Sequence, residues 1–237
     1  MFTKYLPLLG ALTLATSASA VTVNMSDFTF GAPADYSMVG TGGSPSYDGS
    51  AGQFLGTQDD VASDASALRF SLADAASATS FVAWCAELTQ SFSFNTSYDY
   101  TLVSGESHFG AQKATDLSRL FTAAQGFVVD KFTSAALQAA IWEIIYEQGP
   151  SFNLLADMDT SGTFTGSPDD PAGLDAFYKV NGFLLNLGSY EALARIDVLE
   201  NDAHQDFLVA TIPEPETWVL FGLGLGAVGL LKRRRRS

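Results

Sequence analysis

The chain has 237 residues, with 12 basic and 26 acidic side chains, a net charge of −14 and one cysteine. So acidic a chain, without a basic patch interleaved with aromatic residues, excludes nucleic acid as a partner. A single cysteine also excludes an internal disulfide. Three explanations of the Cys85 thiol are open: it is buried and inert, it forms a disulfide with another molecule, or it is committed to a chemical reaction of this protein.

The first 20 residues have the layout of a secretory signal peptide. Lys4 supplies a positive charge at the start, an apolar run covers residues 5–14, and small residues occupy positions 17–20. The apolar run is too brief to span a bilayer, and no longer apolar run follows directly after it, which argues against an N-terminal membrane anchor. We therefore expect signal peptidase to cut after Ala20.

Residues 21–211 are expected to form a single exported domain. Without the two terminal segments, residues 21–212 keep 6 basic and 24 acidic side chains, a net charge of −18. Such a surface favours solubility, cations or neutral polymers. Alternation of apolar and polar residues, or aromatic and β-branched content, predicts strands over 21–30, 67–73, 80–88, 98–103, 190–200 and 207–211. Residues 31–56 are rich in Gly, Ser, Pro and Asp and are predicted to form a long surface loop.

The middle of the chain has helical periodicity instead. Helices are predicted over 113–125, over 135–148 with Thr133 or Ser134 as N-cap, and over 171–187 with Asp170 as N-cap. Strands, then helices, then strands indicate an α+β fold. We expect a β-sandwich or barrel-like sheet with an inserted helical segment, an N-terminal signal helix and a short hydrophobic C-terminal helix.

Two further sets of residues are weighed as functional sites. Asp157, Asp159 and Ser161 resemble the first half of a calcium loop, but Pro168 occupies the twelfth position, where a glutamate is needed. No cofactor is therefore expected, with calcium near these residues only a weak alternative. His108 and His204 lack the sequence context of a Cys-His hydrolase, and two histidines without clustered cysteines do not make a zinc site.

The C-terminal segment, 212–237, has three elements in order. Pro213, Glu214 and Pro215 come first, an apolar stretch over 217–231 follows, and a basic cluster of Arg233, Arg234, Arg235 and Arg236 closes the chain. As a helix, the apolar stretch rises roughly 22 Å, short of the roughly 30 Å hydrocarbon core. The basic cluster orients the domain outward. A segment this short indicates a transient membrane attachment.

This order resembles the PEP-CTERM sorting signal of Gram-negative bacteria, which is recognised by the membrane enzyme exosortase. The resemblance implies export across the inner membrane, removal of the tail near Pro213-Glu214-Pro215, and release or re-attachment at the cell surface or in the extracellular matrix. Proteins of this family are usually linked to exopolysaccharide or biofilm production.

Two segments inside the domain resemble the thioester domains of bacterial surface proteins. Phe81-Val-Ala-Trp-Cys85-Ala-Glu87 carries the cysteine, and Leu137-Gln138-Ala-Ala-Ile-Trp142 matches a helical Thr-Gln-x-Ala-Ile-Trp motif, with Leu137 in place of Thr. The resemblance implies a bond between Cys85 and Gln138, formed as the thiol attacks the carboxamide and ammonia leaves. Glu87 is expected to shuttle a proton, and Trp142 with Phe81 to exclude water.

The sequence therefore predicts a sorted surface or matrix protein that uses a Cys85–Gln138 thioester for adhesion, by covalent attachment to an amine- or hydroxyl-bearing partner. Its partners would be signal peptidase, exosortase, and an extracellular polymer or surface protein. Because the bond is consumed, the protein is not expected to be a turnover enzyme. The alternative is a passive matrix or exopolysaccharide-binding protein in which Cys85 is buried and free. An enzyme acting on extracellular polymer lacks a recognisable catalytic set.

Overall fold

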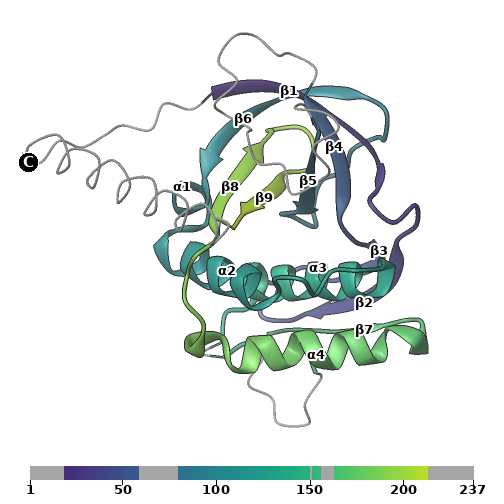
Figure 1. Cartoon of the computed structure of the whole chain (residues 1–237), viewed down its shortest axis with the longest axis vertical. Helices are drawn as coiled ribbons and strands as arrows, with labels where there is room; N and C mark the ends of the chain where they lie inside the picture. Colours follow the sequence, from purple (N-terminus) through teal and green to yellow (C-terminus); the bar gives the residue numbers. More distant parts are fainter. Residues whose placement is uncertain (1–18, 59–79, 150, 156–162, 213–237) are drawn as a thin grey trace, which may run out of the picture.

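The computed structural model describes residues 19–58, 80–149, 151–155 and 163–212 (Figure 1). Most of the signal segment, the predicted strand over 67–73, Asp157, Asp159 and Ser161 of the calcium loop, and the sorting tail from Pro213 onward lie outside these residues. The expectations made for them remain predictions.

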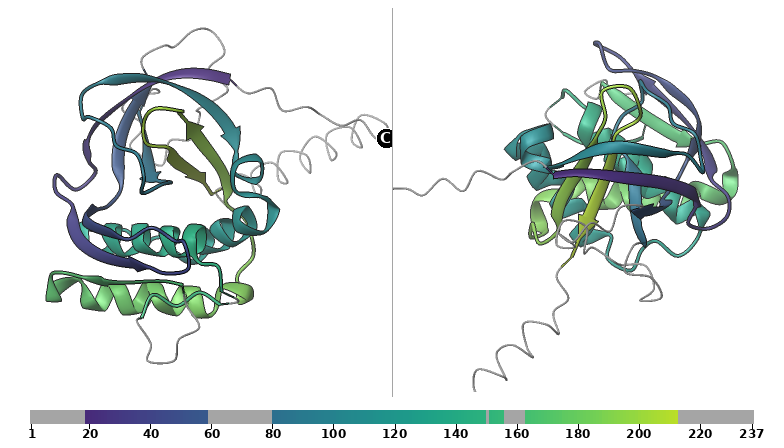
Figure 2. Two further views of the ribbon diagram at one scale, coloured as in Figure 1. Left: turned by 180° about the vertical axis from the view of Figure 1, so that it is seen from behind. Right: turned by 90° about the horizontal axis from the view of Figure 1, so that it is seen from above.

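Six antiparallel strands close into a barrel in the order β1-β4-β5-β9-β8-β6 (Figures 1 and 2). They are β1 (Ser19–Phe28), β4 (Phe54–Gln58), β5 (Ser80–Cys85), β6 (Ser97–Ser104), β8 (Arg195–Glu200) and β9 (Phe207–Thr211). Closure pairs both edges of every strand, so the barrel presents no free edge. The barrel-like sheet expected from the sequence is confirmed.

The barrel interior is filled by alternate residues of its strands and by aromatic rings. Val21, Val23 and Met25 of β1 are at most 5 % exposed, as the alternation predicted. The ring of Phe207 lies 5.5 Å from that of Phe54, with Phe92 and Tyr100 at 5.0 and 5.9 Å. These edge-to-face contacts hold β4, β6 and β9 around one core.

The described residues contain four α-helices, and the first of them begins directly after β6. They are α1 (Gly105–Phe109), α2 (Ala111–Ala123), α3 (Lys131–Tyr146) and α4 (Leu174–Leu185), with short 3₁₀ turns at Pro171–Gly173 and Leu187–Ser189. Helices α2 and α3 lie across one end of the barrel (Figure 1). Every residue of α3 from 134 to 144 is buried. A helix that is buried on all sides must be covered on all sides: α3 lies across the end of the barrel (Figure 1) and packs against a second sheet and α4.

This second sheet has the order β3-β2-β7 and corrects one prediction. Residues 31–56 are not a loop: they contain β2 (Ala34–Gly40), β3 (Tyr47–Ala51) and the start of β4, while β7 (Phe164–Pro168) was not predicted at all. In β2, Ala34, Tyr36 and Met38 are buried, and the residues between them are more exposed. The many glycines and serines on either side of this short alternating pattern give residues 31–56 the composition of a loop, which is why the strands were not predicted.

The helix starts were predicted in part. Helix α3 begins at Lys131, four residues before the expected start, and its N-cap is Asp130. The Asp130 carboxylate accepts from the Thr133 N–H at 2.8 Å, while the Thr133 hydroxyl accepts from the Asp130 N–H at 3.0 Å. This reciprocal pair of hydrogen bonds is a capping box, in which Asp130 is the N-cap and Thr133 occupies the N3 position. Asp170 caps the 3₁₀ turn before α4, as expected of it.

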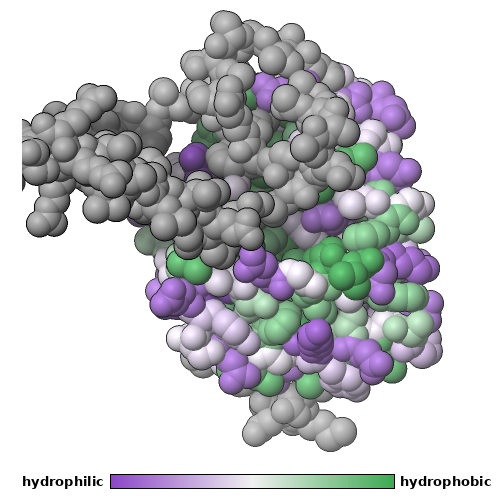
Figure 3. Space-filling model, viewed as in Figure 1, coloured by the Kyte–Doolittle hydropathy of each residue, from purple (hydrophilic) through white to green (hydrophobic). Residues whose placement is uncertain are grey.

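The surface mixes polar and apolar residues. On the face drawn in Figure 3, hydrophilic and hydrophobic residues are interspersed over the helical layer. Several larger apolar side chains are exposed, among them Val129 and, on α4, Tyr178 and Leu185. Within the described ranges, no helix is both long and apolar enough to cross a membrane.

Candidate functional site

Cys85 is the last residue of β5 and lies at the end of the barrel that α3 covers. It pairs with Phe207 of β9, so its side chain shares a face of the sheet with the barrel core. Only 6 % of the residue is exposed. Cys85 therefore lies on a strand, as the sequence predicted, and it is buried. Whether its thiol can react depends on the side chains around it.

Gln138, on the second turn of α3, meets Cys85 through the main chain. Its Nε2 donates to the Cys85 carbonyl at 2.9 Å, and its Oε1 accepts from the Cys85 N–H at 2.8 Å. The amide thus pairs with Cys85 as a neighbouring strand would, ahead of the first residue of β4, Phe54. Cys85 and Gln138 come together as expected, but both polar ends of the Gln138 amide bind the main chain of Cys85, and neither contacts the sulfur.

The amide that contacts the sulfur belongs to Gln205, which the sequence analysis did not single out. Gln205 Nε2 contacts Cys85 Sγ and also donates to the main-chain carbonyl of Glu87 at 2.9 Å. The residue is 8 % exposed. The β5–β9 register pairs Cys85 with Phe207, which brings Gln205 opposite Glu87 and diagonal to Cys85. Diagonal neighbours on one sheet face lie within reach of long side chains.

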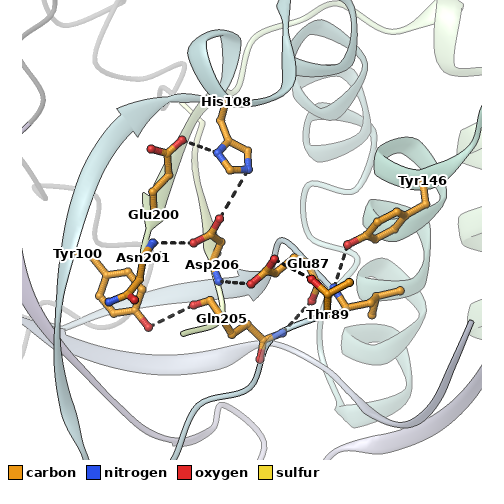
Figure 4. Close-up of polar contacts among 10 residues, drawn as sticks. Glu87, Thr89, Tyr100, His108, Tyr146, Glu200, Asn201, Gln205 and Asp206 are labelled. Atoms are coloured by element: carbon orange, nitrogen blue, oxygen red, sulfur yellow. Dashed lines mark hydrogen bonds and ion pairs between the residues drawn. The ribbon is translucent and has the colours of Figure 1, made fainter. Parts of the chain in front are cut away.

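Glu87 connects the cysteine and the second glutamine through its main chain. Its carbonyl oxygen accepts from Cys85 Sγ at 3.3 Å as well as from Gln205. Its carboxylate turns to the other side, where it accepts from Thr89 Oγ1 at 3.2 Å and from the Asp206 N–H at 3.4 Å (Figure 4). The expectation for Glu87 concerned its side chain, whereas the group at the sulfur is its carbonyl.

The surroundings of Cys85 keep its thiol neutral. Burial raises the pKa of the Cys85 thiol far above its usual range, and the negative charge of Glu87 raises it further, against hydrogen bonds that lower it. Burial likewise raises the pKa of Tyr47 and of Tyr146 to about 12. The thiol therefore carries its proton at neutral pH, and a reaction at sulfur must move that proton in the same step.

A second polar group lies beside Gln205. His108, on α1, contacts Glu200 with Nδ1 at 2.5 Å and faces Asp206 with Nε2 at 3.8 Å (Figure 4). The Asp206 carboxylate also accepts from the Asn201 N–H at 2.7 Å. Burial and the charges of Glu87 and Glu200 raise the pKa of Asp206 to about 6, while the Asn201 bond and His108 oppose that rise. The partners of His108 are carboxylates, in line with setting aside a Cys-His pair.

The two aromatic residues expected to exclude water lie in different places. Trp142 is 1 % exposed, with its ring 4.9 Å from that of Tyr47, and its Nε1 is buried without a hydrogen-bond partner within the described part of the chain. Phe81 packs against Gly56, where an added Cβ would approach the ring to 2.6 Å. Phe81 precedes Cys85 by four residues, about 13 Å along the strand. It belongs to the barrel core, and Trp142 lies one helical turn beyond Gln138.

The structure offers little for a metal. Among the described residues, no group of three or more His, Cys, Asp or Glu side chains is arranged to hold an ion. The predicted weak calcium alternative concerns residues outside the described ranges.

Comparison with known proteins identifies a family for one segment of the chain, its C-terminus. Residues 211–236 match the family model of the PEP-CTERM protein-sorting motif, which covers the three elements identified in the tail. This match marks the chain as an exported protein that an exosortase-type enzyme sorts, with transient membrane attachment through its C-terminus. No curated protein and no solved structure matches the chain.

Proposed function

We propose that this exported, exosortase-sorted protein attaches covalently to an extracellular partner through an internal thioester between Cys85 and Gln205. The observation that carries the proposal is the contact of the Gln205 amide with the Cys85 sulfur in a buried site. Gln138, the partner expected from the sequence, takes a different role: its amide fixes the main chain of Cys85 through two hydrogen bonds.

The chemistry follows from the contacts. The Cys85 sulfur adds to the Gln205 carboxamide carbon, the C–N bond breaks, and the thiol proton leaves with the nitrogen as ammonia. Amides are poor electrophiles, so the reaction depends on holding the two groups together at high effective concentration. The strand register, the Gln138 clamp and the Glu87 carbonyl supply that positioning.

The thioester would later react once with a nucleophile on the partner and release the Cys85 thiol. A bond that is used once suits attachment to a cell surface or a biofilm matrix, because removal of the sorting tail also removes the membrane hold. No turnover is involved, and the protein is in this proposal a single-use crosslinker rather than an enzyme.

A passive matrix protein with an inert thiol is the second candidate. The nearly complete burial of Cys85 and its raised pKa favour it, because both suppress the reactivity of a free thiol. In that case the contact of Gln205 with sulfur is only a buried polar contact, and neither residue forms a covalent bond.

Intact-mass measurement of the exported protein separates the two candidates. We expect a mass below that of the processed sequence by one ammonia, lost in Cys85→Ala and in Gln205→Ala. Gln125→Ala, in an exposed glutamine on the loop after α2, is the matched control and should keep the deficit. Full mass in the wild type would sink the thioester and leave the passive protein. A deficit that survives Gln205→Ala but not Gln138→Ala would restore the partner predicted from the sequence.

A further inference from the structure

The sorting motif begins inside the folded barrel. The matched segment starts at residue 211, and Thr211 is the last residue of β9, where it pairs with Arg195 of β8. Pro213, the first proline of the motif, follows directly after Ile212. Because consecutive residues span at most about 3.6 Å each, an enzyme that binds Pro213 and its neighbours must contact the surface around the end of β9.

An apolar groove opens at this surface, where β9 ends next to α2 (Figure 1). The groove encloses about 440 Å³, and Ala210 and Ile212 line it together with Phe30, Trp84 and Phe121. The rings of Trp84 and Phe121 lie 6.1 Å apart and join β5 to α2. None of the residues that line the groove is charged, although the chain carries 26 acidic side chains. The groove therefore suits an uncharged, apolar group of a partner.

We propose that this groove is a docking surface for the exosortase-type enzyme that sorts the protein, and that an apolar side chain of the enzyme fills it. Ile212 belongs to the matched motif and also lines the groove, so the two surfaces are continuous. A partner that holds the motif gains the groove as a second contact within the same complex, at high effective concentration. The inference does not depend on the proposed thioester.

The length of chain beyond the groove brings the enzyme within reach. The apolar stretch of the tail begins at Thr217, five residues after Ile212. Five residues span at most about 18 Å, so Ile212 and the groove that it lines stay within about that distance of the membrane while the tail is attached to it. Lipid is within the same reach, but the acidic domain repels anionic lipid. The sorting enzyme is therefore the occupant that we expect.

The first test replaces Phe30, which lines the groove and is 37 % exposed. Phe30→Glu places a charge in the apolar lining, and Tyr178→Glu, at a 56 % exposed position on α4, is the matched control. The rate of tail removal from the full-length protein is followed by pulse-chase in cells that contain the sorting enzyme. We expect Phe30→Glu to slow tail removal at least about tenfold and the control to leave it unchanged. Equal rates in the wild type and both variants would overturn the inference.

A second variant leaves every residue of the groove in place. About eight glycine and serine residues are inserted between Ile212 and Pro213, so that a flexible linker separates the motif from the groove. We expect slower tail removal, because the enzyme then meets the groove at a lower effective concentration. Recognition of the motif alone predicts the opposite, since the linker moves the folded barrel away from the motif. An unchanged or faster rate would therefore refute docking.

Two further measurements separate docking from other causes. Urea unfolding of Phe30→Glu is expected to match that of the wild type; with a lowered midpoint in this variant, the inserted linker alone decides. The exported protein, after tail removal, is also mixed with phosphatidylcholine vesicles that hold no enzyme, and we expect no binding. Binding to these vesicles that Phe30→Glu abolishes would assign the groove to lipid and overturn the enzyme as its occupant.

Discussion

Two buried polar clusters lie along helix α3 and its C-cap, Glu147, and they are built differently. Toward the barrel, Gln138 binds Cys85, and the sulfur of Cys85 contacts Gln205. Toward the loop after the helix, Glu147 accepts from the Thr163 N–H at 2.8 Å, the Thr163 hydroxyl at 2.9 Å and the Phe164 N–H at 3.1 Å. Both clusters satisfy main-chain groups, as buried polar residues generally do.

The two clusters differ in the contacts that they make beyond these main-chain hydrogen bonds. In the Glu147 cluster, the carboxylate serves loop N–H groups and the Thr163 hydroxyl, and Glu143 nearby accepts from the Asn153 N–H at 2.7 Å. These contacts hold the connection between α3 and β7 and need no further explanation. In the Cys85 cluster, the side chain of Gln205, two residues before β9, meets the sulfur at the end of β5. We infer that the first cluster stabilises the fold and that the second is built for chemistry.

Opening the proposed thioester should have the largest effect on stability. The bond would join residues 120 apart in sequence. Treatment with methylamine is expected to lower the free energy of unfolding by about 4–5 kcal/mol, because a crosslink of this span restricts the unfolded chain. Thermal unfolding before and after treatment measures the change. Cys85→Ala serves as control, and an equal shift in that variant would show that methylamine acts elsewhere.

Glu147→Ala should have the next largest effect. It leaves the N–H groups of Thr163 and Phe164 without their acceptor in a site where the residue is 4 % exposed. We expect a loss of about 3 kcal/mol in urea unfolding at neutral pH. Glu106→Ala, at an exposed position of α1, is the matched control. A loss below about 1 kcal/mol would contradict the structural role of this cluster.

Glu143→Gln is expected to stabilise the protein at alkaline pH. Burial raises the pKa of Glu143 to about 8, so the folded state holds a proton that the unfolded chain releases above its ordinary pKa. Wild-type stability should therefore fall as pH rises from about 4.5 to 8, and glutamine removes that fall. We expect a gain of about 2 kcal/mol at pH 8 and none at pH 4. A pH-independent difference between the two proteins would show that Glu143 ionises normally.

Asp206→Asn should have the smallest effect, with the same sign. The raised pKa of about 6 means that wild-type stability falls between about pH 4 and 6 as the unfolded chain loses the proton first. With the carboxyl partly screened by solvent, we expect a gain of about 1 kcal/mol at pH 7, measured by urea unfolding. Asp202→Asn, an exposed aspartate of the same hairpin, should change nothing. If both variants respond alike, the effect comes from net charge.

Local patterns in the sequence predicted much of this protein. The ends of the chain, the alternation in β1 and β9, the strand that carries Cys85 and the apolar helix with Gln138 and Trp142 each depend on residues within about ten positions of one another. Such signals can be read without knowing the fold, because side-chain periodicity follows from the geometry of a single helix or strand. The capping box at Asp130 has the same local character, although the sequence analysis expects Thr133 or Ser134 as the N-cap.

The second sheet and the site depended on contacts between distant segments. Strands β2 and β3 were missed because burial under α3, rather than their own composition, makes them strands. Gln205 has no distinguishing local pattern in the sequence. The register of β5 against β9 brings it to Cys85, and α3 brings Gln138 to the main chain instead of the sulfur. The sequence thus determined that the cysteine meets a glutamine, and the tertiary structure decided which glutamine faces the sulfur, because that choice depends on strand register across 120 residues.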